Sequence, residues 1–167
     1  FEIQAQKLAK LVDKTLFSVS TEETRYYLNG IYIHSVINNG SEVFRVVATD
    51  GHRLSRLSAG LPKNAEGLSG VIIPRKTVIE LRKILDNKES IVNIKISKNK
   101  IKFVKDNITI TSKLLDGAFP DYERVIPNNN KKELVIDTKE FIDAVDRVST
   151  LSSDRTRAIK FDLKNKL

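Results

Sequence analysis

The sequence predicts an α+β protein in which two amphipathic helices pack on antiparallel β-sheets. Apolar residues recur at helical spacing in two segments, one within residues 1–19 and one from Arg75 to Leu85. The remaining segments resemble strands, and several are joined by links so short that they must be hairpins. The start of the chain also recurs near its end, which predicts pseudo-repeated domains. Hydrophobic residues make up 40% of the 167 residues, so a packed core is possible.

The first helix is expected to follow a short strand within residues 1–19. Its apolar face comprises Ala5, Leu8, Leu11, Val12, Thr15 and Leu16, which recur at helical spacing. A second face of the same helix carries the cations Lys7, Lys10 and Lys14. The helix is therefore expected to have an apolar back and a basic front.

Three strands are expected next, separated by turn signals. They are Arg25–Ile37, Glu42–Ala48 and Arg53–Leu57. Asn29-Gly30 is interpreted as a bulge within the first of them, with a hairpin turn as the alternative. Asn38-Asn39-Gly40-Ser41 predicts the turn before the second strand, and Asp50-Gly51 the turn before the third.

A loop at residues 58–70 and a brief strand at residues 71–73 lead through Pro74 into the second helix, Arg75–Leu85. Its apolar residues are Val78, Leu81, Ile84 and Leu85, and its opposite arc holds Arg75, Lys76, Arg82 and Lys83. Three hairpin-linked strands follow at residues 91–97, 100–105 and 107–115, with Ile101, Phe103, Ile108 and Ile110 expected on one face. Glycine, proline, asparagine and lysine then give residues 116–133 the composition of a linker.

The segment Leu134–Ser149 repeats the first segment of the chain, Phe1–Leu16. Asp146 aligns with Asp13, and, after one residue is removed, Arg157 aligns with Arg25. Both copies are expected to form strand–helix–strand units ending in β-like segments, Tyr26–Ile33 and Ala158–Leu163. The helix of the second copy should begin with a capping box made by Asp137 and Glu140. Such repetition favours a solenoid or a closed ring.

Composition excludes several kinds of site. The chain has no cysteine, and its two histidines, His34 and His52, are too few for a multi-histidine metal site. Glycine-rich phosphate-binding motifs are absent, so neither a metal nor another cofactor is expected. No apolar run approaches the roughly 20 residues of a membrane span, and no signal peptide is visible, so a cytoplasmic protein is expected. The net charge of +8 favours a polyanionic partner such as nucleic acid.

The stretch "ATDGHRLSR" (residues 48–56) concentrates polar residues in one turn. Asp50 and His52 would be an acid–base pair or two metal ligands if the protein were an enzyme, yet no nucleophile or third ligand is indicated. Alternatively, Asp50 caps backbone N–H groups and Gly51 takes a positive φ in a hairpin turn. We expect the turn and no catalytic residue.

Four segments carry a family signature: "RYYLNGIYI" (Arg25–Ile33), "RVVATDGHRLSRLS" (Arg45–Ser58), "VIIPRKTVIEL" (Val71–Leu81) and "TSKLLDGAFPDYERVIP" (Thr111–Pro127). In this order they resemble the bacterial DNA sliding clamps, the beta subunits of DNA polymerase III. The resemblance implies a clamp fold with a middle domain at residues 1–118, a linker at 119–132 and the start of a third domain at 133–167. It also implies a head-to-tail homodimeric ring, with helices lining the hole and sheets outside.

The resemblance further implies a pocket for short partner peptides. Its wall would comprise Leu28, Thr49, Gly51, His52, Arg53, Leu54, Pro120, Arg124 and Val125, with Arg25 at its edge. The implied partners are the replicative DNA polymerase subunits, the clamp loader and other proteins with clamp-binding peptides. Under this hypothesis His52 borders an apolar groove together with Leu28 and Pro120. Two or more carboxylates or a metal ion around His52 would instead favour an enzyme.

Duplex DNA is implied to pass through the ring without sequence reading. The expected DNA-contacting residues are Lys7, Lys10, Lys14, Arg75, Lys76, Arg82 and Lys83, and Tyr26 and Tyr27 are either further contacts or sheet core. The acids Glu22 and Glu23 should repel phosphate. The protein is thus expected to be a non-catalytic processivity factor, with a hydrolase or nuclease using Asp50 and His52, or an independent basic nucleic-acid-binding module, as alternatives. The chain alone is expected neither to encircle DNA nor to dimerise.

Overall fold

The computed structural model describes residues 1–85, 89–152 and 158–163. The chain divides into two compact units, Phe1–Tyr122 and Glu123–Leu167. The first unit contains the two sheets and the helices α1 and α2, and the second contains α3. Within the described ranges, every helix is too short or too polar to cross a membrane.

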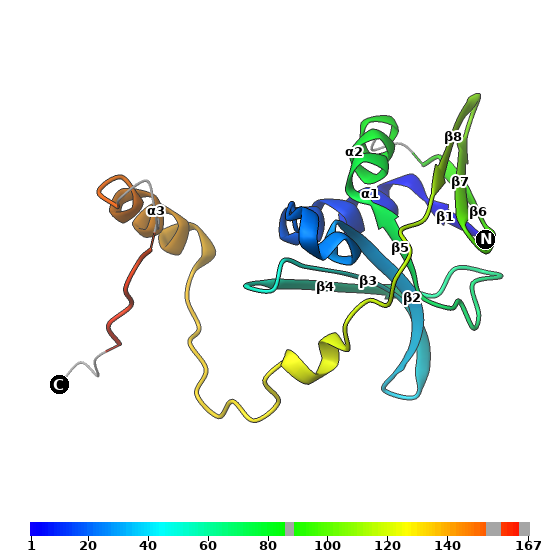
Figure 1. Ribbon diagram of the computed structural model, residues 1–167. Helices are drawn as coiled ribbons and strands as arrows, with labels where there is room; N and C mark the ends of the chain where they lie inside the picture. Colours follow the sequence, from blue (N-terminus) through cyan, green and yellow to red (C-terminus); the bar gives the residue numbers. More distant parts are fainter. Residues whose placement is uncertain (86–88, 153–157, 164–167) are drawn as a thin grey trace. The chain divides into compact units, whose positions relative to one another are not determined.

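Two antiparallel sheets, each of four strands, form the first unit (Figure 1). One sheet has the order β1-β6-β7-β8, with strands at Glu2–Gln4, Ile91–Ile96, Lys100–Lys105 and Ile108–Lys113. The other has the order β4-β3-β2-β5, with strands at Leu54–Gly60, Ser41–Thr49, Gly30–Asn38 and Val71–Pro74. The turns predicted at Asn39-Gly40 and Asp50-Gly51 connect β2 to β3 and β3 to β4.

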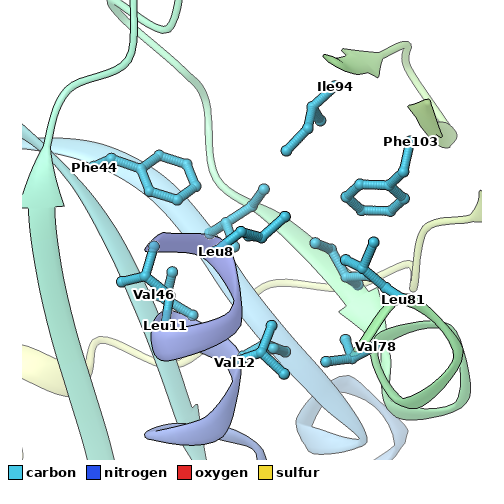
Figure 2. Close-up of a pocket in the computed structure, with 12 residues that line it drawn as sticks. Leu8, Leu11, Val12, Phe44, Val46, Val78, Leu81, Ile94 and Phe103 are labelled. Atoms are coloured by element: carbon cyan, nitrogen blue, oxygen red, sulfur yellow. The ribbon is translucent and has the colours of Figure 1, made fainter. Parts of the chain in front are cut away.

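The helices α1 (Ala5–Asp13) and α2 (Arg75–Ile84) bury their apolar sides in a core shared with both sheets. Figure 1 shows the two helices beside one another, above β2–β4 and to one side of β6–β8. Figure 2 shows side chains from both helices and both sheets converging on the centre of this core; they include Leu8, Leu11, Phe44, Val46, Val78, Leu81, Ile94 and Phe103. Burial of each such side chain stabilises the fold by about 1.5–3 kcal/mol. The predicted α+β arrangement of two helices on antiparallel sheets is confirmed.

The helix α1 ends earlier than its apolar pattern suggests. Thr15 lies beyond the end of α1, is fully buried, and donates its hydroxyl hydrogen to the Leu11 carbonyl at 2.7 Å. The Ser55 hydroxyl on β4 likewise donates to the Lys14 carbonyl. Since the last carbonyls of a helix lack intrahelical partners, these side chains replace the missing bonds and fix the end of α1 against β4.

The expected strand Arg25–Ile37 is wrong in its first part. Residues Glu23–Leu28 form the 3₁₀ helix η2, and β2 begins only at Gly30, so Asn29-Gly30 is neither a bulge nor a hairpin. The Asn29 backbone N–H donates to the Tyr26 carbonyl, and its side-chain amide donates to the Glu22 carbonyl at 3.0 Å. These local bonds, which β propensity does not anticipate, stabilise the turn. A Cβ at Gly30 would lie 2.3 Å from the Ile73 carbonyl oxygen, so glycine permits the close pairing of β2 with β5.

The second unit keeps only the helical part of the expected repeat. Its helix α3 (Thr138–Ser149) begins as predicted, because the Asp137 carboxylate accepts hydrogen bonds from the N–H groups of Lys139 and Glu140. The expected β-like segment Ala158–Leu163 is not a strand, and neither is the stretch before Asp137. A strand needs a paired neighbour, and the described part of this unit offers none. The alignment of Arg157 with Arg25 falls outside the described residues.

The first unit continues beyond residue 118 and includes Tyr122. The Phe119 ring stacks on Tyr32 with ring centroids 4.7 Å apart, and the buried Tyr122 hydroxyl lies 2.8 Å from His34 Nε2. The Arg45 guanidinium lies 3.4 Å from the same hydroxyl. Residues 119–122 therefore pack on β2 and β3, although their composition predicted a linker.

Candidate functional site

The turn between β3 and β4 is built around the Asp50 carboxylate. One carboxylate oxygen accepts the backbone N–H groups of His52 and Arg53, each at 3.0 Å, and the other accepts the Arg53 Nε–H at 3.1 Å. Gly51 has φ +89°, and its N–H donates to the Thr49 hydroxyl. The turn interpretation of "ATDGHRLSR" is confirmed, with Asp50 as the cap and Gly51 in the left-handed conformation.

The hydrogen bonds of this turn govern the ionisation of Asp50. Partial burial alone would raise its pKa, but the N–H groups of Arg53 and His52 and the Arg53 guanidinium together outweigh burial and hold the pKa below its ordinary value. Asp50 is therefore an ionised structural group at neutral pH. A carboxylate whose two oxygens are both occupied is poorly suited to serve as a base.

The Arg25 side chain extends from η2 over the turn. A Cβ on Gly51 would lie only 2.5 Å from an Arg25 guanidinium nitrogen, so glycine makes room for this side chain. Arg25 is held by Glu22, whose carboxylate accepts from Nε at 2.8 Å and from a terminal nitrogen at 2.6 Å. The acids of the Thr21–Thr24 loop are thus not all free to repel an anion, because Glu22 is paired with Arg25.

A cleft of about 290 Å³ lies beside the turn. Its lining residues are Leu16, Phe17, Val19, Ser20, Thr21, Glu22, Asp50, His52, Arg53 and Arg75. The Arg53 guanidinium lies 5.7 Å from the centre of the Phe17 ring, a cation–π distance. His52 therefore borders a cleft with apolar residues, but Leu28, which is buried, and Pro120, which is exposed, are not among its lining residues.

Two carboxylates, Asp50 and Glu22, also line this cleft, which was the arrangement expected of an enzyme. Both are engaged in ion pairs, Asp50 with Arg53 and Glu22 with Arg25. Among the described residues, no three histidine, aspartate or glutamate side chains gather closely enough to hold a metal ion. The cleft thus combines two paired carboxylates with arginines and a half-exposed aromatic ring.

The remaining residues of the implied peptide pocket are divided between the two units. Thr49 is buried, and its hydroxyl donates to the Arg53 carbonyl at 2.8 Å, while Leu54 is half-buried at the start of β4. Arg124 and Val125 belong to the second unit, where Val125 is 69% exposed. In the first unit, Arg25, Thr49, Gly51 and Arg53 are thus held together by contacts.

The basic residues of α1 and α2 lie on the solvent sides of the helices. Lys7 and Lys10 are exposed along α1, Lys14 is exposed at its C-cap, and Arg75 and Lys76 are exposed at the start of α2. Arg82, by contrast, donates two hydrogen bonds to the Asp13 carboxylate at 2.6 and 3.0 Å, which links the two helices. Lys83 is paired with Glu80 at 2.9 Å. Two of the predicted cations are thus partly neutralised within the chain.

Tyr26 and Tyr27 belong to η2, so they are not sheet core. Tyr26 is 52% exposed and Tyr27 is half-buried. A Cβ on Gly117 would lie 3.4 Å from the Tyr27 side chain and 3.7 Å from the Tyr26 ring, so both tyrosines pack beside the residues that follow β8. The exposed ring of Tyr26 remains available to a ligand.

Phe17 is the cleft residue that sequence reasoning missed. Helical periodicity places the neighbouring Thr15 and Leu16 on the apolar face of the first helix and leaves Phe17 outside it. It lies in the 3₁₀ helix η1 (Leu16–Ser18), where its ring is 56% exposed. A large aromatic residue one position off the apolar stripe was the available signal.

Family models identify the chain. The model described as "DNA polymerase III beta subunit, central domain" matches residues 2–121, and the one described as "DNA polymerase III beta subunit, C-terminal domain" matches residues 123–167. The chain belongs to the DNA polymerase III beta-subunit family. The boundary between the two matches coincides with the junction between the structural units of this beta-subunit chain.

Relatives of this beta-subunit chain are named beta sliding clamps. The one from Caulobacter vibrioides is 47% identical over 95% of the chain, and the one from Rickettsia bellii is 44% identical over 98%. The chain spans only 42% and 43% of these two relatives.

Solved structures agree with this family assignment. A sliding clamp from Bartonella birtlesii bound to griselimycin superposes with a TM-score of 0.88 at 51% identity, covering 94% of this chain and 42% of that one. A Pseudomonas aeruginosa clamp superposes with a TM-score of 0.85 at 38% identity, covering 94% of this chain and 42% of that one. The beta-subunit fold of the chain is therefore shared with sliding clamps of known structure.

Proposed function

We propose that the chain is part of a DNA sliding clamp, a ring that encircles duplex DNA without reading its sequence. The observation that supports this proposal most directly is that α1 and α2 expose Lys7, Lys10, Lys14 and Lys76 to solvent, while the apolar sides of both helices fill one core. A lysine attracts phosphate as a point charge on a flexible stem, without the fixed bidentate geometry of arginine, so DNA can move past these residues. The complete protein would be a head-to-tail homodimer working in the bacterial cytoplasm.

We propose further that the turn after β3 binds partner peptides from the polymerase, the clamp loader and other proteins. Arg25 and Arg53 are fixed by Glu22 and Asp50, so their remaining N–H groups are oriented before a peptide arrives. Phe17 and the apolar residues beside it offer contact area in the adjoining cleft. This arrangement suits an extended peptide that has carbonyl groups and apolar anchors.

A catalytic function of Asp50 and His52 has less support. The Asp50 oxygens are already occupied by Arg53 and by turn N–H groups. Family membership also favours a non-enzymatic accessory subunit over a hydrolase or nuclease. A third hypothesis, an independent basic module, differs from a clamp in how it holds DNA, and a topological experiment separates the two.

Peptide binding can be tested by calorimetry on the full-length protein. A peptide of the form Gln-Leu-x-Leu-Phe should bind, and Arg53→Ala or His52→Ala should weaken it, for Arg53 by roughly tenfold, as for an arginine at an interface hot spot. Arg56→Ala, on the same strand as Leu54, is the control and should leave affinity unchanged. Equal affinity of the wild type and Arg53→Ala would contradict the peptide site.

Encirclement of DNA can be tested on circular and linear duplexes. Once loaded on a closed circle, the full-length protein should remain bound at high salt and should be released when the circle is cut. An independent basic module would instead dissociate from both forms alike as salt rises, because its binding depends on phosphate contacts alone. Salt-sensitive loss from the closed circle would therefore contradict the ring.

A further inference from the structure

A face crowded with lysines lies on the sheet β1-β6-β7-β8, away from the helices. In these strands Ile94, Ile101 and Phe103 point into the core, so the alternate residues point outward. The outward cations on β6, β7 and β8, here named the lysine face, are Lys95, Lys100, Lys102 and Lys113. All four are exposed.

The strand register places lysines of this face directly opposite one another. Lys95 on β6 pairs with Lys102 on β7, and Lys100 on β7 pairs with Lys113 on β8. Like charges opposite each other on one face of a sheet destabilise it, by up to about 1 kcal/mol per pair. Within the described part of the chain none of these lysines forms an ion pair. The lysine face thus lowers the stability of the sheet, and no ion pair within the described chain offsets this repulsion.

Protection of a sheet edge does not explain the arrangement. Lysines on edge strands prevent unwanted pairing with other chains, and Lys113 on the edge strand β8 fits that role. Lys102, however, is paired on both sides, with Lys95 on β6 and Thr111 on β8, whereas Lys95 lies beyond the residues of β6 that pair with β1. A cation on an inner strand does nothing for the edge, so its repulsion calls for an external anion.

We propose that the lysine face docks the sugar–phosphate backbone of a second duplex DNA segment. Residues two apart on a strand are separated by about 6.8 Å. Neighbouring phosphates of one DNA strand rise by only roughly 3.4 Å along the helix axis but also turn around it, so their distance in space is comparable. Lys100 and Lys102 therefore match neighbouring phosphates. Thr109 and Thr111 on the same face of β8 add hydroxyl donors, which commonly contact phosphate oxygens.

The chemistry of the face favours DNA over other anions. A protein partner would be expected to meet aromatic or large apolar anchors, and lysine is depleted from protein interfaces. The outward residues between the lysines are Thr111, Asn93, Thr109 and the half-buried Val104. Ile91, which is 47% exposed at the start of β6, and Glu2 on β1 share this face but lie beyond the lysines, so no large apolar side chain lies among the lysines themselves. A membrane surface would likewise favour apolar or aromatic residues that insert beside the cations. What remains is a polar cationic surface that suits a phosphate backbone.

This surface is distinct from the basic sides of α1 and α2. The helices cover the inner face of the sheet, where Val78 and Leu81 meet Ile94 and Phe103. The lysine face is the opposite face of the same sheet, so one straight duplex does not touch both surfaces. A segment bound here lies outside the clamp hole that the proposed function requires.

The proposal can be tested by fluorescence anisotropy with the full chain and a short duplex, over a series of salt concentrations. Three variants each lose the same number of positive charges through lysine-to-glutamine changes. The changes lie on the lysine face in the first variant, on the helices in the second, and on neither of these surfaces in the third, which is the control. They are K95Q/K100Q/K102Q/K113Q, K7Q/K10Q/K14Q/K76Q and the control K63Q/K131Q/K132Q/K139Q. The first should lower the slope of log affinity against log salt by about 3–4, since each lost phosphate contact removes about 0.9. The control should leave the slope unchanged.

Two outcomes would contradict the proposal. If the lysine-face variant and the control lose affinity equally, only net charge matters and the docking surface is refuted. If the lysine-face variant binds DNA normally but no longer binds vesicles of acidic lipid, the surface serves a membrane and the DNA proposal is wrong. A normal helix variant would count against the proposed clamp function and leave the lysine face unaffected, so the two ideas fail separately.

Discussion

Gly51 meets two demands at a single residue. Its φ of +89° is strained for any L side chain, and the space where a Cβ would lie is taken by the Arg25 guanidinium. Gly40, in the turn between β2 and β3, has a similar φ of +79° but nothing within 4 Å of its missing Cβ. A substitution at Gly40 would therefore cause backbone strain alone, whereas the same substitution at Gly51 would also displace Arg25.

Gly51→Ala and Gly40→Ala should each destabilise the protein by about 1–2 kcal/mol, the cost of a left-handed L residue. Only Gly51→Ala should also weaken binding of the partner peptide, because it pushes Arg25 aside. Chemical denaturation gives the stability, and calorimetry on the full-length protein gives the affinity. Equal peptide affinity for both variants would show that the position of Arg25 does not matter for binding.

The ionisation of Asp50 makes the turn sensitive to acid. Its pKa is lower in the folded protein than in the unfolded chain, so the ionised form stabilises the fold above the unfolded value. This stabilisation should be lost progressively as pH falls below about 4, the pKa of an aspartate in the unfolded chain, and then through the lower pKa of Asp50 in the folded protein. Asp50→Asn should be less stable than the wild type at neutral pH, and the difference should vanish in acid. A stability difference that is independent of pH, followed by thermal denaturation, would contradict this account.

At the scale of elements, strand pairing sets opposing lysines against each other on β6, β7 and β8. Lys102 faces Lys95 across one ladder and Thr111 across the other. Lys102→Thr should therefore stabilise the first unit by about 0.2–1 kcal/mol, through loss of repulsion and gain of a β-branched residue. Lys63→Thr, in the loop after β4, is the control and should have little effect. A loss of stability in Lys102→Thr, measured by denaturant unfolding, would show that the lysines are not in conflict.

The contact between α1 and α2 is a second element-scale feature. The Arg82–Asp13 pair joins the helices on their solvent side, with both side chains more than a third exposed. Such exposed pairs typically contribute about 0.2–1 kcal/mol, so the apolar core beneath, not this bridge, holds the helices together.

At the scale of the whole molecule, the two units differ in how much they bury. The first has a core shared by two sheets and two helices, whereas α3 in the second has no buried residue. Amide hydrogens of α3 should therefore exchange much faster than those of α1, which packs Leu11 and Val12 into the core. Hydrogen exchange measured residue by residue tests this directly. Equal protection of α1 and α3 would mean that the second unit is stabilised by contacts of its own.

The oligomeric state of the chain is also a whole-molecule question. It spans about 42% of its curated relatives, so the ring contacts of a complete clamp are not expected from it alone. Light scattering on the 167-residue chain should give the mass of a monomer. A stable dimer would show that the chain carries an association surface of its own.

The amino-acid sequence by itself determined the helices, most strands and the turn chemistry of this protein. Periodicity located α1 and α2, short polar links located the hairpins, and Asp50-Gly51 and Asp137 were assigned their roles as turn and cap. These features depend on residues that are close together in the chain. Their local hydrogen bonds and side-chain spacing can therefore be predicted from the sequence without knowledge of the fold.

Only the tertiary structure decided which distant residues meet. Arg25 lies over Gly51, Arg53 lies beside Phe17, and Lys95 faces Lys102, because sheet register and turn geometry bring them together. The strand expected from Arg25 began only at Gly30, since hydrogen bonds of Asn29 outweighed β propensity. The stretch Ala158–Leu163 has strand-like composition but no paired neighbour, and without one its backbone bonds cannot form a sheet.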